Sequence, residues 1–123
     1  MRLVKCLAVT AMCLLCVSLA YAGQNKFGVA DSRTLTFTTP MRVGNVLLPK
    51  GNYQVLHTME GQDHVMVFKQ LNTKKPAEAR VKCQLVALEQ RADQTQQIYV
   101  LNAANERVLH TLIFRGDTAK HVF

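Results

Sequence analysis

Residues 53–69 read YQVLHTMEGQDHVMVFK, two runs rich in β-branched and aromatic side chains on either side of a polar, Gly-containing tetrapeptide. Short runs of this kind around a Gly-containing connection are typical of a β-hairpin. A two-residue type II′ turn at Gly61-Gln62 and a four-residue loop over 60–63 both place Glu60 opposite Asp63. The sequence therefore predicts strands over 53–59 and 64–69 with one defined register.

This register brings four side chains with soft donor atoms to one face of the hairpin. Met59 then faces His64 and His57 faces Met66, with directly opposed Cβ atoms about 5 Å apart. Two imidazoles and two thioethers form a donor set that suits Cu(I). The pattern predicts a candidate copper site made of His57, Met59, His64 and Met66.

The same face also has an interpretation that needs no metal. Tyr53, Val55 and Phe68 share it by strand alternation, so the face can form the core, with methionines filling gaps and histidines at its margin. A slip of one residue would send the donors of the two arms to opposite faces. The main expectation is therefore a protein without a cofactor, and copper is the alternative.

Short β runs continue on both sides of the hairpin. Residues 34–38 alternate Thr with apolar side chains, and residues 43–48 form a run that Gly44-Asn45 interrupts. About seven short strands separated by turns favour an all-β fold, either a small antiparallel β-sandwich or a barrel. The remaining predicted strands cover 78–88, 97–101 and 107–115.

A helix over 77–91 is the main competing interpretation, because that stretch holds several good helix formers. Its apolar residues Val81, Cys83 and Leu85 alternate instead of recurring at intervals of three and four. We therefore expect a strand with these three side chains on one face. In that strand Cys83 is a buried and inert thiol and not a reactive nucleophile.

The segment before the hairpin carries a characteristic turn. Leu48-Pro49-Lys50-Gly51-Asn52-Tyr53 follows Met41-Arg42-Val43-Gly44. In this turn Pro fixes φ, Gly supplies a positive φ and Tyr53 begins the returning strand with its ring inward. Over residues 34–69 the chain resembles short uncharacterised exported bacterial proteins of β-sandwich type with an L-P-x-G-x-Y turn. The resemblance implies the fold but no activity, so no functional residue is carried over from it.

The first twenty-two residues have the three zones of a secretory signal peptide. Arg2 and Lys5 form the positive start, residues 6–20 the apolar middle, and Ala20-Tyr21-Ala22 the small-x-small cleavage site. An apolar run of fifteen residues falls short of the roughly 20 that span a bilayer. A lipoprotein is disfavoured because Met12 precedes Cys13 and Leu15 precedes Cys16, at the position where a lipobox has Gly or Ala. We expect cleavage before Gly23 and export to the periplasm or the extracellular medium.

Removing the signal peptide changes the composition that matters for partners. The remaining 101 residues form one domain with a net charge of +5 and a single cysteine, so no intrachain disulfide can form. Within this domain we expect a loose arm over 23–33 and a tail over 116–123. Basic residues gather near the loop at 72–76, but no aromatic residue lies among them to stack bases. The expectation is an unknown envelope or extracellular partner, no nucleic acid and no transmembrane span in the mature chain.

The mature sequence contains no strong residue pattern of a known type of catalytic site. Its only serine is Ser32, in the expected arm, so a Ser-His-Asp site would lack a well-placed nucleophile. No His or Met follows Cys83 closely, so the ligand loop of a blue-copper protein is missing too. By alternation His110 is expected in the core or at its margin, and His121 falls in the tail.

These patterns favour a small exported protein that is not an enzyme and acts by binding or as a structural component of the envelope, with its ligand unknown. The alternative, from a different class, is a periplasmic protein that binds Cu(I) through the His/Met hairpin.

Overall fold

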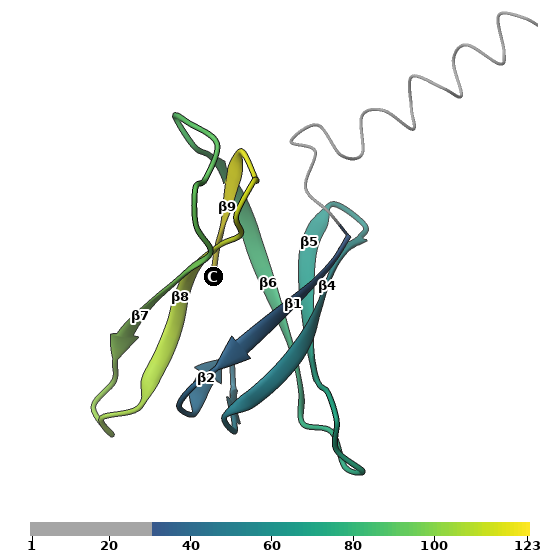
Figure 1. Ribbon diagram of the computed structural model, residues 1–123, viewed down its shortest axis with the longest axis vertical. Helices are drawn as coiled ribbons and strands as arrows, with labels where there is room; N and C mark the ends of the chain where they lie inside the picture. The colour runs from purple at the N-terminus through teal and green to yellow at the C-terminus, as the bar shows by residue number, and fades with distance from the viewer. Residues whose placement is uncertain (1–30) are drawn as a thin grey trace, which may run out of the picture.

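The computed structural model describes residues 31–123, which form strands and their connections without any helix (Figure 1). The predicted signal peptide over 1–22, its cleavage site and most of the expected arm lie outside the described residues. No segment of residues 31–123 forms a helix with the length and apolar character that a membrane crossing requires.

Nine strands make up the described chain, which confirms the prediction of an all-β fold. The hydrogen-bonded order is β1-β4-β5-β6-β9-β8-β2-β3, and β7 pairs with β8 beside this path. All pairings are antiparallel except that of β2 with β8, which is parallel. The strands are β1 (Ser32–Phe37), β2 (Met41–Val43), β3 (Val46–Leu48), β4 (Gly51–Glu60), β5 (Asp63–Gln70), β6 (Glu78–Ala87), β7 (Gln96–Leu101), β8 (Arg107–Ile113) and β9 (Ala119–Val122).

The long strand β6 connects the two layers of the sheet. Its residues 78–83 pair with β5 and its residues 84–87 pair with β9. In Figure 1, β6 runs obliquely between the layer of β1, β4 and β5 and the layer of β7, β8 and β9. The sheet does not close into a barrel, so of the two architectures expected from the sequence only the sandwich type agrees with the structure.

A single core fills the space between the layers. Phe37 lies between two rings, with centroid distances of 5.2 Å to Tyr53 and 6.3 Å to Phe68. These three side chains are almost completely buried, in agreement with the core interpretation of the hairpin face. The other buried members of the core are Leu35, Met41, Val43, Leu48, Val55, Met66, Ala79, Cys83, Leu109, Leu112 and Phe114.

Two turns have the conformations that their sequences predict. Gly51 has a φ of 148°, and Tyr53 is buried, with its hydroxyl donating to the Pro49 carbonyl at 2.5 Å. At the hairpin tip Gly61 has a φ of 64° and Gln62 has a negative one, as a type II′ turn requires. The predicted register is confirmed, with His57 opposite Met66, Met59 opposite His64 and Glu60 opposite Asp63.

The two expected irregular ends are wrong in part. The tail over 116–123 contains β9, which alternates buried and half-buried residues between β6 and β8. The expected arm over 23–33 already enters β1 at Ser32. Four residues are too few for a periodic signal to stand out, and β9 forms because two longer strands offer it free backbone groups on both sides.

The expected core position of His110 is also wrong. The pairing of β7 with β8 shifts register between Ile98 and Tyr99, so that Thr111 and Leu109 find partners but His110 does not. A β-bulge of this kind breaks the alternation of faces that the prediction assumed. His110 is exposed, and its ring is 2.7 Å from the Thr111 hydroxyl.

Candidate metal centre

Three strands that are distant in sequence bring together His57, Cys83 and His121. These residues come from β4, β6 and β9, and one donor atom of each lies within 4.8 Å of the donors of the other two. Within residues 31–123 this is the one group of three or more His, Cys, Asp or Glu residues with such spacing. The hairpin alone therefore does not form the site, which depends on the tertiary fold.

Strand pairing explains how the donors meet. Cys83 lies directly opposite His64 across the β5–β6 ladder, where the two side chains share a face. His121 lies opposite Leu85, two residues farther along the Cys83 face of β6. The Cys83 sulfur is 3.9 Å from His121 Nδ1. β6 thus connects the donors of the two layers.

The imidazoles form a continuous cluster. The rings of His57 and His64 stack, with centroids 5.1 Å apart and an angle of 6° between their planes, and His57 Nε2 is 3.2 Å from His64 Nδ1. His121 meets the His57 ring edge-on at 5.2 Å and packs against Phe114 on another side at 5.8 Å. His64 is therefore held against a donor residue and is close enough to orient it.

Burial controls the protonation of the donors. Cys83 is 7% exposed and His121 is fully buried. Burial raises the pKa of the Cys83 thiol to about 11 and lowers the pKa of His121 to about 4. The pKa of His57 is also lowered, first by burial and then by the nearby His64. At neutral pH both imidazoles are neutral and can bind a metal, whereas the thiol must lose its proton to do so.

His121 has an unsatisfied polar group. No atom of the described chain forms a hydrogen bond with its buried Nε2. A buried nitrogen without a partner costs on the order of 1 to 3 kcal/mol. Such groups are rare in folded proteins, and each calls for an explanation such as a ligand or an ion.

An ion pair with one buried and one half-buried partner lies beside the cluster. Arg33 of β1 pairs with Asp117, which precedes β9 and is 3% exposed. Burial raises the pKa of this carboxyl group, and the Arg33 guanidinium acts in the opposite direction. The guanidinium carbon is also 5.7 Å from the centroid of the Phe114 ring. Arg33 and Asp117 thus close this side of the histidine cluster with two opposite charges.

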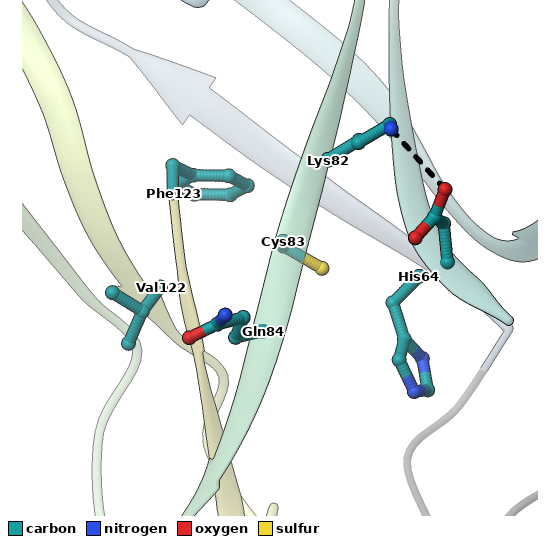
Figure 2. Close-up of a pocket in the computed structure, with 7 residues that line it drawn as sticks. His64, Lys82, Cys83, Gln84, Val122 and Phe123 are labelled. Carbon is teal, nitrogen blue, oxygen red and sulfur yellow. Dashed lines mark ion pairs between the residues drawn. The ribbon is translucent and has the colours of Figure 1, made fainter.

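One pocket leads from solvent to the cluster (Figure 2). It measures about 390 Å³, and both His64 and Cys83 line it. Figure 2 shows the Cys83 sulfur projecting from β6 on the side where the His64 ring lies. At its rim Lys82 pairs with Asp63 at 3.2 Å. The pocket therefore ends at the Cys83 side of the cluster, although Cys83 itself is only 7% exposed.

The four residues predicted from the hairpin have different environments. His57 and His64 belong to the cluster, Met66 is fully buried in the core, and Met59 is 46% exposed near the hairpin tip. The sequence did not indicate Cys83 and His121 as donors. For Cys83, alternation with Val81 and Leu85 predicted burial but no metal-binding role. Only the β6–β9 pairing, which the sequence does not reveal, brings Cys83 and His121 together.

The donor set itself limits the chemistry. Two imidazoles and one thiolate suit zinc and copper, whereas calcium and magnesium prefer carboxylate and carbonyl oxygens. For ion–nitrogen and ion–sulfur distances of about 2.0 and 2.3 Å, neighbouring donors lie about 3.3 to 3.7 Å apart. Cys83 Sγ and His121 Nδ1 are 3.9 Å apart, close to this range, whereas the other donor separations reach up to 4.8 Å and would have to shorten by as much as about 1 Å when an ion binds.

Comparisons with known proteins leave the residues themselves as the only guide to function. No family model, no curated protein and no solved structure matches the chain.

Proposed function

We propose that this protein binds a transition-metal ion through His57, Cys83 and His121, and that it is an exported protein without catalytic activity. The observation that carries the proposal is the convergence of three donor atoms from three strands within 4.8 Å. The unsatisfied Nε2 of His121 supports it, because an ion bound at this nitrogen would supply the partner that the described chain does not provide. The proposal revises the donor set expected from the hairpin: His57 stays, and Cys83 and His121 replace the two methionines.

The compartment rests on the N-terminal sequence. A positive start, an apolar run and an Ala-Tyr-Ala site over residues 1–22 favour export and cleavage before Gly23. In the periplasm or outside the cell, a single thiol that is shielded from solvent is also protected from chance disulfide exchange. Burial of Cys83 therefore suits a metal ligand in an oxidising compartment.

A structural role in the envelope is the second candidate. Its support is the exposure of four consecutive apolar residues on β7, from Ile98 to Leu101, which are 40 to 60% exposed. Exposed apolar strands of this kind often contact other macromolecules. The two candidates differ in one respect: only the first requires the His/Cys cluster.

Titration with Co(II) under anaerobic conditions tests metal binding. Co(II) replaces zinc in tetrahedral His/Cys sites and reports a thiolate ligand through its absorption spectrum. We expect one ion per chain, with affinity reduced at least about tenfold in Cys83→Ser, His57→Gln and His121→Gln. Intact mass measurement on exported protein should give a chain that begins at Gly23.

His110→Gln is the matched control, because His110 also lies on a strand but is exposed and outside the cluster. This variant should bind Co(II) like the parent protein. Met66→Leu separates the two donor sets, since only the hairpin set requires the thioether. The structural role would be the better explanation if the Cys83 and His121 variants bound Co(II) as well as the parent protein does and had the same circular dichroism.

A further inference from the structure

We propose that the ion at this centre is copper, and that the His57, Cys83 and His121 donors hold it as both Cu(II) and Cu(I) in a trigonal His₂Cys site. This inference rests on the proposed function, because it specifies the metal for the same three donors. It also reverses an expectation from the sequence, in which the lack of a Cys-to-His ligand loop argued against a blue-copper type of centre. Here three strands supply the donors that one loop supplies elsewhere.

The number of donors favours copper over zinc. Structural zinc sites have four protein ligands, and zinc sites with three keep an open position for water. In the described chain only three His, Cys, Asp or Glu donors come within 4.8 Å of one another. Three donors leave a structural zinc ion one protein ligand short of its usual four. Copper with two imidazoles and one thiolate is stable in a trigonal arrangement.

The surroundings of the donors also suit copper. Cys83 belongs to the hydrophobic core, and His121 packs against Phe114. An apolar shell around a thiolate-bound copper excludes water and adjusts the reduction potential. Met66 lies opposite His57 on the same face and is fully buried, so the shell includes a soft side chain next to a donor. These contacts come from both layers and limit how far the donors can move when the oxidation state changes.

His64 has a positioning role in this centre. Its Nδ1 is 3.2 Å from His57 Nε2, and the parallel stacking of the two rings fixes the plane of the donor imidazole. His64 also lines the pocket of about 390 Å³ together with Cys83. Of the four cluster residues only His64 and Cys83 line this pocket, so a small one-electron donor in it would contact these two.

The redox step is a simple one. Cu(II) bound to the Cys83 thiolate accepts one electron and becomes Cu(I), while the donors remain bound and no proton moves. The electron comes from an external one-electron donor, for which ascorbate serves as the laboratory reagent. On reoxidation, Cu(I) passes the electron to an external acceptor such as ferricyanide and becomes Cu(II) again. The thiolate must stay unoxidised throughout, and the burial of Cys83 provides that protection.

Addition of Cu(II) to the purified protein, followed by absorption spectroscopy, tests the inference. We expect an intense visible thiolate-to-copper charge-transfer band at one copper per chain, which ascorbate bleaches and ferricyanide restores. Cys83→Ser should abolish the band, and His57→Gln and His121→Gln should weaken copper binding at least about tenfold. His64→Gln should shift the band or the reduction potential without loss of stoichiometry, and His110→Gln should change nothing.

The outcomes separate this inference from the proposed function. If Co(II) binds through Cys83 but Cu(II) yields no charge-transfer band, the centre is a metal site of another kind and the copper assignment is wrong. Oxidation of Cys83 to an intermolecular disulfide by Cu(II) would overturn it equally. If the parent protein and His110→Gln are both folded by circular dichroism and neither binds Co(II) or Cu(II), both proposals fail. Cys83→Ala, which removes the sulfur but adds no polar atom, checks that lost binding does not reflect lost folding.

Discussion

Several neighbours of His121 oppose its protonation. It is fully buried, it faces His57 and His64, and Arg33 adds a third basic group nearby, so its pKa falls to about 4. In the unfolded chain its pKa returns to the ordinary value of 6.5. Between these two values the unfolded state binds more protons than the folded state. The stability of the metal-free protein therefore falls as the pH drops from 6.5 to 4.

Replacement of this side chain by an apolar one should remove most of that pH dependence. From the two pKa values, protonation of His121 lowers the free energy of unfolding by about 2 kcal/mol at pH 5 and about 3 kcal/mol at pH 4. We expect metal-free His121→Leu to lose much less stability than the parent over this range. The variant should also gain stability at pH 7, because the unsatisfied Nε2 is gone.

Urea unfolding of the metal-free proteins at pH 7, 5 and 4 measures the effect. His57 has a lowered pKa and leaves a smaller slope of the same sign in both proteins. Asp117 has a raised pKa and contributes with the opposite sign, again in both. Parallel stability curves for the parent and His121→Leu would contradict the argument.

At the scale of the elements, β7 is the longer of two edge strands without a charged residue; the other, β3, has only three residues. β7 pairs with β8 alone, and its sequence QQIYVL contains no charged residue. Natural edge strands usually carry Lys, Pro or a bulge that prevents pairing with other chains. The bulge in the β7–β8 ladder lies at Ile98 and Tyr99, which leaves Val100 and Leu101 beyond it unprotected. We therefore regard this edge as the part of the fold most prone to self-association.

A charge on β7 should reduce aggregation with little effect on stability. Val100 is 52% exposed, so Val100→Lys should lower the aggregation rate several-fold and change the free energy of unfolding by less than about 0.5 kcal/mol. Val86→Lys is the matched control, because it adds the same charge at a 40% exposed position outside β7, where Val86 pairs with Lys120 of β9. Light scattering at high protein concentration compares the two. An equal reduction by both variants would assign the effect to net charge and not to the edge.

The strands show which features the sequence predicts. Runs of β-branched and aromatic residues predicted β4 and β5, alternation predicted β6, and the Gly61 turn set the register of the β4–β5 hairpin. Prediction from the local sequence pattern failed at β9, because four residues are too few to show a clear period. It also failed at His110, because a bulge changes which face of β8 the side chain occupies. The candidate site was predicted only as far as its two hairpin histidines, which are neighbours in one ladder. Cys83 and His121 are 38 residues apart and come together only through the β6–β9 pairing.

For the whole molecule, β9 is a connecting element. The path of hydrogen-bonded strands runs from β6 through β9 to β8, so in the described sheet β9 joins β6 to β8. It also carries a donor of the candidate centre, and its Ala119 and His121 side chains are fully buried. The backbone N–H of Phe123 extends the connection by donating to the His110 carbonyl at 2.9 Å. The fold and the proposed site thus depend on the same short segment.

Deletion of residues 119–123 should therefore unfold the protein and not merely remove a metal ligand. The deletion exposes the edges of β6 and β8 and leaves their backbone groups without partners, in addition to removing two fully buried side chains. We expect a chain that ends at Thr118 to show no cooperative thermal transition and no Co(II) binding. The full-length His121→Leu variant is the control: it keeps the strand, and it should unfold cooperatively while binding Co(II) weakly. Cooperative unfolding of the shortened chain would mean that the two layers hold together through core packing alone, and that β9 serves the site without supporting the fold.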